Sequence, residues 1–555
     1  MLQQEISDQL NLLSKLMDIH GENSFKSKAY SSAAFALDKL TIDLKQASIS
    51  DLAKVKGIGQ SVAEKIKGIV ETGTFPLLLS YIEKTPPGIL EMLQIKGIGP
   101  KKIATIWKEL EIEDIASLLY ACYENRLVLY KGFGEKTQSN IQASIEFYLN
   151  SQGKFLYADL EATVQTLQDF FTTQLKDSSY RISPAGSWYR QDTVIEELSF
   201  ITDMPIETLL GFLKHLSVEI KEKSNNYVLA TAGEGLKIRI ESVSTNEYIS
   251  SLFVSSCSES FLNSFKSNYS WQDGLSFNSE QELFEFYKAP YRPPFLREFY
   301  KVQTREEELV TTSSIRGIIH SHSQWSDGTH SLEEMAKAAK AQGFEYLVIS
   351  DHSKSAFYAN GLQVERVYAQ HEQINELNEK LAPFKIFKSI ECDILTDGSL
   401  DYDKNVLEEF DLVIASIHSN LKMNEEKATD RLLKAIENPY TNILGHMTGR
   451  LLLGRAGYPI QHEKIIDACA KNRVVIELNA HPRRLDIDWT WIPYALDKGV
   501  TLSINPDAHS IEGFKDIQYG VKAGRKGHLT ISKNLSSYSL LQMEQFIEHQ
   551  HKKRD

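Results

Sequence analysis

Cysteine is scarce in this 555-residue chain, and its four cysteines lie far apart in the sequence. A chain without a C-x-x-C pair has neither the spacing of a disulfide-rich small domain nor that of a thiolate zinc site. The sequence therefore predicts reduced, structural thiols. They are Cys122, Cys257, Cys392 and Cys469.

Long apolar runs are also absent. No stretch approaches the roughly 20 apolar residues that a membrane-spanning helix requires. The first residues, MLQQEISDQL, carry acidic side chains where a signal peptide has basic and apolar ones. We therefore expect a cytoplasmic protein with no membrane association.

Basic residues are not in excess. There are 61 Lys and Arg against 74 Asp and Glu, for a net charge of -13. This balance argues against non-specific nucleic-acid binding by bulk charge, so any such contact must be local. The hydrophobic fraction of 42% and mean hydropathy of -0.30 are those of globular proteins, and the length predicts several domains.

Histidine is unevenly distributed. Of 15 histidines, only His20 and His215 precede residue 316. Because histidine is the commonest metal ligand and general base, this distribution places the predicted chemistry in the C-terminal part of the chain.

One short pattern recurs three times in the first 150 residues, which have the apolar spacing of helices. Each copy has an apolar helical turn, a basic residue, the tripeptide G-h-G, where h is apolar, and a second amphipathic helix. The copies are LAKVKGIGQSVAEKIKGIV at 52–70, LEMLQIKGIGPKKIATIWK at 90–108 and LVLYKGFGEKTQSNIQASI at 127–145.

The two glycines allow a left-handed turn and let a phosphate approach the amino terminus of the second helix. A single G-h-G is equally well explained as a tight helix–helix turn, but three copies favour an anion-binding element. The pattern resembles the helix-hairpin-helix motif, which implies binding to the DNA backbone without sequence readout. The residues implied in DNA binding are Gly57, Gly59, Gly97, Gly99, Gly132, Gly134, Lys56, Lys101 and Lys102.

The pattern changes twice further along the chain. Residues 155 to 290 mix helical spacing with strand-like alternation, and the proline-rich stretch APYRPPFLREF at 289–299 has the composition of a linker. From residue 315, apolar strands alternate with amphipathic helices, which predicts a barrel-like parallel α/β domain. The seven strands are IRGIIHSH, YLVISDH, KIFKSIECDI, LVIASIHS, NILGHM, VVIELNA and TLSINPDAH.

Polar residues stand at the carboxyl ends of these strands, which form the catalytic rim of such barrels. A lone histidine there is better explained as an ordinary loop or core residue, but many on one rim indicate a metal site. The candidate ligands are His320, His322, Asp327, His352, Glu391, His418, His446, Asp507 and His509. Five histidines lack this placement and are expected on the surface or in helices: His330, His371, His462, His481 and His528.

The set HSHSQWSDG, SDH, SIECDI, SIHS, GHMTGR and PDAH resembles the polymerase and histidinol phosphatase (PHP) domain, a metal-dependent phosphoesterase. The resemblance implies three divalent ions, Mn²⁺, Zn²⁺ or Fe²⁺, with Glu391 and Asp507 as catalytic ligands and Arg450 stabilising phosphoryl oxygens. It assigns His320, His322, Glu391 and Asp507 to the first ion, Glu391, His418 and His446 to the second, and Asp327, His352 and His509 to the third.

The order of the regions resembles bacterial DNA polymerase X family proteins, which place a palm and thumb before a PHP domain. In that family a Gly-Ser turn and an arginine pair precede an Asp-x-Asp strand, and a third Asp follows on a later strand. The residues at these positions here are Gly186, Ser187, Arg190, Glu197, Ser199 and Lys237. Because Ser199 is uncharged and Lys237 repels cations, we expect no polymerase activity. The alternative is that Asp192 or Asp203 serves instead.

The expected fold is multidomain, with an all-α helix-hairpin-helix region, an α+β nucleotidyltransferase-like palm and thumb, and a distorted TIM-like (β/α)7 barrel. The expected domains are a DNA-end-binding domain at 1–80, a fingers-like domain at 81–150, palm and thumb at 151–290, a linker at 291–314 and the PHP domain at 315–555.

The leading hypothesis is a DNA-repair phosphodiesterase, a 3′–5′ exonuclease with abasic-site or 3′-end processing as related activities. Its partners would be DNA ends, gaps or primer-templates, together with repair proteins. The alternatives are an active repair polymerase with PHP proofreading, a phosphatase of small phosphate esters, and a non-catalytic DNA-binding scaffold.

Overall fold

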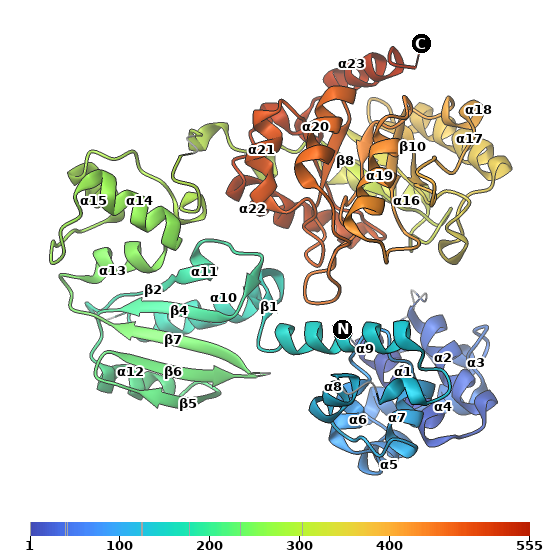
Figure 1. Ribbon diagram of the computed structural model, residues 1–555, viewed down its shortest axis with the longest axis horizontal. Coiled ribbons are helices and arrows are strands. Elements are labelled where there is room, and N and C mark those ends of the chain that lie inside the picture. The colour runs from blue at the N-terminus through green and yellow to red at the C-terminus, as the bar shows by residue number, and fades with distance from the viewer. Residues whose placement is uncertain are drawn as a thin grey trace. The chain divides into compact units, whose positions relative to one another are not determined.

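The computed structural model describes residues 2–38, 40, 43–123, 126–176, 178–233, 235–301 and 304–554. The chain divides into two compact units, Met1–Gln152 and Gly153–Asp555, whose elements are labelled in Figure 1. Among the helices described, none is long and apolar enough to cross a membrane.

The first unit is helical throughout. Its core consists of apolar residues at helical spacing, such as Leu10 and Leu13 of α1, which are fully buried. Its elements are α1 (Leu2–His20), α2 (Ser24–Asp38), α3 (Ile49–Ala53), α4 (Gln60–Thr72), α5 (Pro76–Glu83), α6 (Pro87–Met92), α7 (Pro100–Lys108), α8 (Ile115–Tyr123), the 3-10 helix η1 (Leu127–Leu129) and α9 (Glu135–Ser151).

The three predicted hairpin turns share one backbone geometry. Their first glycines are left-handed, with φ of 101° at Gly57, 95° at Gly97 and 94° at Gly132. Their second glycines cap the next helix, Gly59 for α4, Gly99 for α7 and Gly134 for α9. The apolar residue between is buried, whereas the glycines, Lys56 and Lys101 are exposed and Lys102 is half-buried. A methyl group added to any second glycine would meet nothing within 4 Å, so these amides are open to a ligand.

The second unit begins with a mixed sheet in the order β2-β4-β7-β6-β5, in which only β4 and β7 run parallel. Alternate residues of β4 and β7, such as Leu198 and Ile238, are buried in a core with α10 and α12. The elements are β1 (Phe155–Leu156), α10 (Tyr157–Gln174), β2 (Ile182–Ala185), α11 (Gly186–Tyr189), β3 (Val194–Ile195), β4 (Glu197–Thr202), α12 (Ile206–Leu213), β5 (Val218–Lys223), β6 (Tyr227–Ala232) and β7 (Leu236–Ser242).

Three helices follow the sheet and pack beside its β2 edge (Figure 1). They enclose an aromatic core that includes Phe253, Phe265 and Phe284. These helices are α13 (Tyr248–Ser255), α14 (Glu259–Tyr269) and α15 (Glu280–Phe286).

The stretch expected to be a linker folds into three short 3-10 helices. Arg297 within it is fully buried, 2.6 Å from Glu280. The fully buried Lys526 of the following domain lies 2.7 Å from Asp192 and 2.6 Å from Glu298, so this joint is a packed charge network. The helices are η2 (Pro294–Leu296), η3 (Glu306–Glu308) and η4 (Thr312–Ser314).

The remaining residues form the predicted barrel, a seven-stranded sheet in the order β14-β13-β12-β11-β10-β9-β8 with every pair parallel. All seven predicted strands are present, and the expected fold class is confirmed. Its strands are β8 (Gly317–Ser321), β9 (Tyr346–Ile349), β10 (Lys385–Asp393), β11 (Leu412–Ser416), β12 (Ile443–Leu444), β13 (Val475–Asn479) and β14 (Leu502–Asn505).

Helices connect the strands and cover the barrel, because the strands are apolar on both faces. They are α16 (Leu332–Ala341), η5 (Phe357–Ala359), α17 (Val364–Leu381), α18 (Lys404–Leu407), α19 (Glu425–Ile436), α20 (His462–Asn472), η6 (Trp489–Trp491), α21 (Ile492–Asp497), η7 (Ile511–Asp516), α22 (Ile517–Lys526), η8 (Ile531–Lys533), η9 (Leu535–Ser537) and α23 (Leu540–His551).

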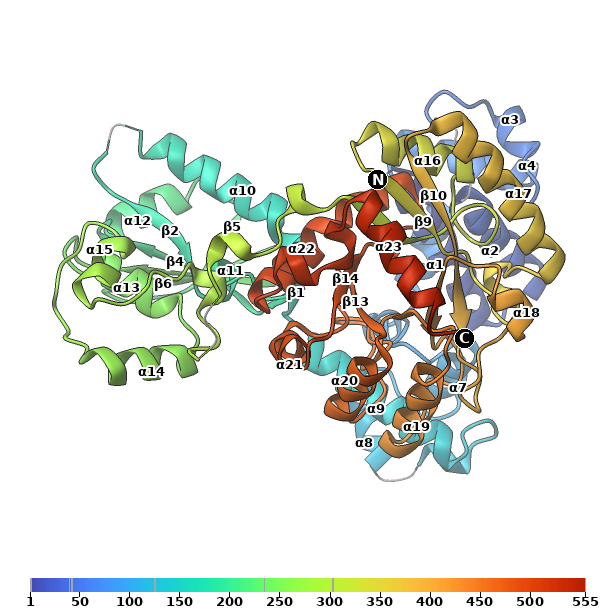
Figure 2. The same cartoon turned by 90° about the horizontal axis from the view of Figure 1, so that it is seen from above.

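The two ends of the barrel differ. At the carboxyl ends of the strands, the amide of His322 donates to the carbonyl of Ala508 at 2.8 Å, which brings β8 and β14 together. At the amino ends, Met543 and Ile547 of α23, red in Figure 2, join an interior cluster with residues such as Leu412. The barrel is thus closed by α23 at one end and lined with polar groups at the other.

Candidate metal centre

The structure brings together all nine predicted ligands at the carboxyl ends of the barrel strands. Each strand end delivers one or two of them, so residues far apart in sequence converge. His320 lies in β8, His322 directly follows it, and Asp327 lies in the next loop. His352 follows β9, Glu391 lies in β10, His418 follows β11, His446 follows β12, and Asp507 and His509 follow β14.

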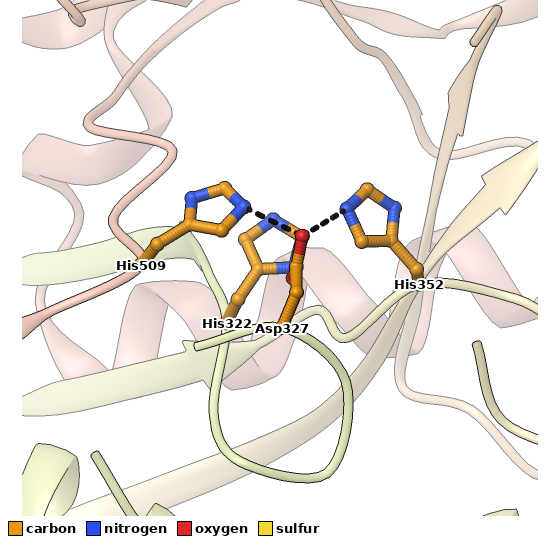
Figure 3. A group of neighbouring side chains, drawn as sticks. All are labelled: His322, Asp327, His352 and His509. Carbon is orange, nitrogen blue, oxygen red and sulfur yellow. Dashed lines mark ion pairs between the residues drawn. The ribbon is translucent and has the colours of Figure 1, made fainter. Parts of the chain in front are cut away.

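In one group of four side chains, three histidines surround Asp327 (Figure 3). Its Oδ2 atom lies 3.5 Å from Nε2 of His352 and 3.5 Å from Nε2 of His509. Its Oδ1 atom lies 3.8 Å from Nδ1 of His322. The carboxylate therefore faces three imidazoles from three different strand ends.

A second group surrounds the buried Glu391. Its Oε1 atom lies 3.0 Å from Nε2 of both His418 and His446, and 3.3 Å from Nε2 of His320. Its Oε2 atom lies 3.0 Å from Nδ1 of His352. Nε2 of His322 lies 3.6 Å from the same Oε2 atom. Five imidazoles therefore converge on one carboxylate, which places Glu391 at the centre of the cluster.

Asp507 connects the two groups. Its Oδ1 atom lies 3.2 Å from Nε2 of His322 and 3.5 Å from Nε2 of His320. Its Oδ2 atom accepts a hydrogen bond from Asn479 at 3.0 Å and lies 3.5 Å from Nε of Arg484.

The cluster fits divalent cations. Three sets could each hold an ion, with ligand atoms within 4.8 Å of one another. The buried nitrogens His320 Nε2, His322 Nδ1 and His352 Nδ1 have no hydrogen-bond partner among the described residues, although carboxylate oxygens lie nearby. Orphaned imidazole nitrogens beside carboxylates are the donor set that Mn²⁺, Zn²⁺ and Fe²⁺ prefer. The sets are His322, Asp327, His352 and His509; His320, His322 and Glu391; and His352, Glu391 and His418.

These sets overlap with the predicted grouping but differ in detail. His322 joins the Asp327 set as well as the His320 set, and His352 contacts both Asp327 and Glu391. His446 and Asp507 belong to none of the three sets. His446 lies 3.0 Å from Glu391, and Asp507 lies 3.2 Å from His322.

Charges within the cluster are balanced by its own residues. Burial would raise the pKa of Glu391, but the charges of His418 and His320 hold that pKa well below its usual range. Burial would lower the pKa of His320, but the carboxylates of Glu477 and Glu391 raise it well above its usual value. Protons therefore compete with metal ions for these ligands.

Two ligands have an unusual backbone. His320 and Asp507 are left-handed, with φ of 61° and 52°. The pairing of β8 with β9 is irregular between Ile318 and Ser321, which re-aims the side chain of His320 between them. A left-handed conformation costs about 1–2 kcal/mol at a non-glycine residue, and such strain clusters at functional sites.

The residues that hold the candidate ligands in place were not predicted from the sequence. Buried Glu477 accepts a hydrogen bond from Nδ1 of His320 at 2.6 Å and from the amide of His446 at 3.1 Å. Asp393 accepts from Nδ1 of His418. Such carboxylate partners fix the orientation and basicity of a ligating imidazole. The sequence marks Glu477 as the one charged residue of the apolar strand VVIELNA, but it does not show whether such a residue is a ligand or the partner of one.

Asp351, a strand-end residue outside the ligand set, supports the loop that carries Asp327. It is fully buried and accepts hydrogen bonds from the amide and hydroxyl of Ser323, both at 2.8 Å, and from Gln370 at 2.6 Å. Burial raises the pKa of Asp351.

Arg450 does not point into the cluster. Its guanidinium contacts Asp488 at 2.5 Å, donates to the carbonyl of Arg484 at 2.9 Å and also bonds the carbonyl of Leu485. The arginine beside the ligands is Arg484, through its contact with Asp507.

The mixed sheet within residues 151–290, which the sequence predicts to be a palm, shows a different arrangement. On the parallel strands β4 and β7, Glu197 lies opposite Lys237 and Ser199 lies opposite Arg239. Nε of Arg239 is 3.2 Å from Oε1 of Glu197, and the hydroxyl of Ser199 donates to the same oxygen at 3.3 Å. The carboxylate is thus neutralised by the protein's own cation.

The other palm residues are committed elsewhere. Gly186 and Ser187 open α11, and Gly186 is left-handed, with a position for Cβ only 3.0 Å from Oγ of Ser199. Arg190 lies 3.0 Å from Glu298 and 2.9 Å from Asp192.

Both residues weighed as replacement carboxylates also hold ion pairs. Asp192 contacts Arg190 and Lys526, and Asp203 lies 2.9 Å from Arg181 with its side chain almost wholly buried.

Comparisons with known proteins agree with this architecture. Three family models match the chain: a helix-hairpin-helix domain at 1–75, a SAM-like helix-hairpin-helix tandem at 89–146 and a PHP domain at 319–481.

A relative from Bacillus subtilis (strain 168), named DNA polymerase/3'-5' exonuclease PolX, is 32% identical over 577 residues, covering 97% of this chain and 98% of its own length. A probable phosphatase from Acetivibrio thermocellus is 30% identical over 167 residues, covering 29% of this chain and 64% of that protein. A probable phosphatase from Caldanaerobacter subterraneus is 27% identical over 178 residues, covering 30% of this chain and 63% of that protein.

Proposed function

Since the chain belongs to the DNA polymerase X family, we propose that it is a DNA-processing phosphodiesterase, a 3′–5′ exonuclease whose palm does not polymerise. Its relationship to that family and its PHP domain support hydrolase activity on phosphate esters. The observation that carries the proposal is a contrast. Seven of the nine predicted ligands form groups that could hold a metal ion, and His446 and Asp507 contact these groups, whereas the palm carboxylate is paired with Arg239.

The barrel residues would hold divalent ions. We assign this role to His320, His322, Asp327, His352, Glu391, His418, His446, Asp507 and His509. When bound, such ions supply Lewis acidity that activates water and offsets negative charge on phosphoryl oxygens. Glu477 accepts a hydrogen bond from Nδ1 of His320, and Asp393 accepts one from Nδ1 of His418. These hydrogen bonds keep Nε2 of each imidazole directed at Glu391.

Arg484 is the cation that we assign to phosphate contact, in place of Arg450. It is about one-fifth exposed, so it is open to a ligand, and it already faces the anion Asp507. A guanidinium matches a phosphate in the same bidentate geometry as a carboxylate. Arg450 instead stabilises the 484–488 turn that carries Arg484.

The helical unit supports DNA as the substrate. Three turns present exposed glycine amides at helix amino termini, which suits the phosphates of a backbone. We propose that Gly57, Gly59, Gly97, Gly99, Gly132, Gly134, Lys56, Lys101 and Lys102 bind DNA ends, gaps or primer-templates, and that repair proteins are further partners.

The palm at 151–290 has the sheet of a nucleotidyltransferase without its carboxylate triad. Two-metal nucleotidyl transfer requires clustered carboxylates that are free to bind cations. Glu197 faces Arg239 and Lys237, and Asp192 and Asp203 hold ion pairs. These contacts support the loss of polymerase activity in this chain.

The test is one assay with Mn²⁺ on a 5′-labelled primer-template, with and without dNTPs, beside the Asp507→Asn variant. We expect shortening by the wild type, loss of shortening in the variant and no extension at any dNTP concentration. Template-dependent extension would instead establish an active polymerase.

Hydrolysis of a small phosphate ester is the second candidate, because two relatives that match about 30% of the chain are named probable phosphatases. If small esters are the substrates, the wild type should hydrolyse p-nitrophenyl phosphate while leaving the primer intact, and DNA should not compete.

A further inference from the structure

Two neighbouring aromatic side chains are exposed at the mouth of the barrel. Phe357 is 87% exposed, the highest value for a large apolar side chain among the described residues, and Tyr358 is 62% exposed. Both belong to η5, which follows His352 in the loop after β9. Large exposed apolar groups that lie together indicate a contact surface, whereas single ones need no explanation.

The ring of Tyr358 lies near a candidate ligand, and the ring of Phe357 lies next to that of Tyr358. The ring centroid of Tyr358 lies 6.4 Å from that of His352, whose Nδ1 is 3.0 Å from Glu391. The rings of Phe357 and Tyr358 are 6.0 Å apart at an interplanar angle of 78°. A molecule whose phosphate reached the ligands would therefore pass directly beside two aromatic side chains.

The loop that carries the rings is anchored on both sides. Ala356 before them and Ala359 after them are buried. Asn360 is left-handed, with φ of 56°, and Gly361 packs so tightly that a Cβ there would lie 2.0 Å from the carbonyl of Ser353. Because the flanking residues are fixed, the exposure of the rings is a property of the fold.

This loop is also tied to the loop that carries Asp327. The Asn360 side chain donates to the carbonyls of Trp325 at 3.3 Å and Ser326 at 3.4 Å. Arg366 donates to the carbonyl of Asn360 at 2.8 Å and also bonds the carbonyl of Trp325. The aromatic pair is thus held in a fixed position relative to the loop that carries Asp327.

Aromatic faces beside a phosphate site suit a nucleobase. In a nucleotide, the base is separated from its phosphate by one sugar, so the base reached here is that of the nucleotide whose phosphate lies at the ligands. Stacking of a base on an aromatic ring is favourable for every base, because each has a π-face, and it requires an unpaired base. A small inorganic or aliphatic phosphate would make no use of these rings.

We propose that Phe357 and Tyr358 form a stacking platform for the unpaired base of the 3′-terminal nucleotide, and that this platform selects single-stranded or frayed DNA ends. The inference rests on the proposed nuclease function and identifies the part of the substrate that the site recognises beyond the phosphate. It predicts indifference to base identity and a preference for unpaired over paired ends.

A binding measurement tests the platform independently of cleavage. The Asp507→Asn chain is mixed with a single-stranded oligonucleotide that ends in 2-aminopurine, whose fluorescence falls when it stacks. We expect quenching, and we expect its loss when Phe357 and Tyr358 are also changed to alanine, while fluorescence anisotropy still reports DNA binding through the helical unit. Unchanged quenching in the alanine variant would overturn the proposal.

A kinetic cycle sharpens the result. On a single-stranded oligonucleotide, the change of Phe357 and Tyr358 to alanine should raise KM about tenfold, with a smaller change in kcat. On an oligonucleotide whose 3′ residue is a base-free tetrahydrofuran, wild type and variant should have the same KM. The single variant Phe357→Trp, which keeps an aromatic ring beside Tyr358, should have the wild-type KM. Leu541→Ala, which removes a 63% exposed apolar side chain of α23, should change neither substrate's kinetics.

The outcomes separate this inference from the proposed function. If DNA is shortened but the alanine variant loses activity equally on both substrates, the rings only support the ligand loop and the platform is wrong. If quenching occurs as expected but no DNA is shortened, the nuclease proposal fails and base binding stands. If the substitutions convert a dimer into a monomer by sedimentation without changing KM, the rings contact a second copy and the platform is wrong.

Discussion

The barrel and the palm each place a carboxylate on a strand that pairs in parallel with its neighbour, yet they surround it with different partners. In the barrel, Glu391 faces imidazoles of five histidines. In the palm, Glu197 faces the guanidinium of Arg239. An imidazole can release its proton and become a metal ligand, whereas a guanidinium stays protonated and cannot. The difference shows that what decides a cation site is the chemistry of the partner that faces the carboxylate.

The largest effect should come from the central carboxylate of the barrel. Glu391→Gln keeps the shape of the side chain but removes the charge on which five imidazoles converge. We expect exonuclease activity to fall by more than the roughly 100-fold typical of the residues behind a ligand. Primer-shortening rates measure the loss, and fluorescence anisotropy should show unchanged DNA affinity. An active Glu391→Gln enzyme would remove the distinction between barrel and palm.

The partner of His418 should matter nearly as much. Asp393→Asn leaves Nδ1 of His418 without its carboxylate acceptor, and we expect a loss of about 10- to 100-fold in activity or Mn²⁺ affinity. The matched control is Asp397→Asn, in an exposed turn of the same domain, where no change is expected. Equal effects of the two substitutions would show that the buried pair has no role in metal binding.

The hairpin turns should affect DNA binding and not catalysis. Gly99→Ala adds a methyl group to a residue with φ of -80° that meets no neighbour within 4 Å, so folding is preserved. The methyl group blocks close approach of a phosphate, and we expect about tenfold weaker DNA binding by anisotropy. Activity on p-nitrophenyl phosphate, measured in the same preparation, should stay constant. A drop in both would place the damage in the fold.

Acid should destabilise the barrel more than the palm. Burial lowers the pKa of His528 to about 4, and also that of His371 to about 4. Because the unfolded chain binds protons near pH 6.5, this stability is complete above that pH and is lost as the pH falls toward 4. Between pH 7 and pH 5, the Tm of His528→Leu should therefore fall by a few degrees less than the Tm of the wild type. Calorimetry measures both values. If Tm depends on pH identically in the two proteins, His528 takes up a proton as readily in the folded chain as in the unfolded chain, and the prediction is wrong.

The smallest effect should come from the palm. Glu197→Gln removes one member of a partly exposed ion pair, and we expect shortening rates within about twofold of the wild type. Neither protein should extend a primer. Extension by the wild type that disappears in Glu197→Gln would reverse the comparison and restore the palm as a polymerase site.

Much of the barrel could be predicted from the sequence because its strands are short apolar runs and its candidate ligands directly follow them. The convergence of Asp327 and His509 on one another needed only the rule that parallel strands share a rim. Glu477 and Asp393 were missed because they lie within strands, where sequence position alone does not separate a buried partner from a ligand.

Other features depend on contacts that a linear pattern does not contain. Arg450 follows a ligand in GHMTGR, but its guanidinium turns toward Asp488. The role of Arg239 depends on the β4–β7 register, which sets it opposite Ser199. His528 was expected on the surface or in a helix, yet it is 2% exposed. In each case, packing between distant segments decided the outcome.

The closure of the barrel by α23 has a consequence for turnover. Met543 and Ile547 pack against the strands at the end opposite the ligands, so the route through the barrel is blocked there. For the proposed nuclease, a DNA strand cannot be threaded through, and each released nucleotide must leave by the route that the next DNA end takes to enter. The strand must withdraw between cuts, which favours release of the DNA after each step and makes free nucleoside monophosphates competitors of the substrate.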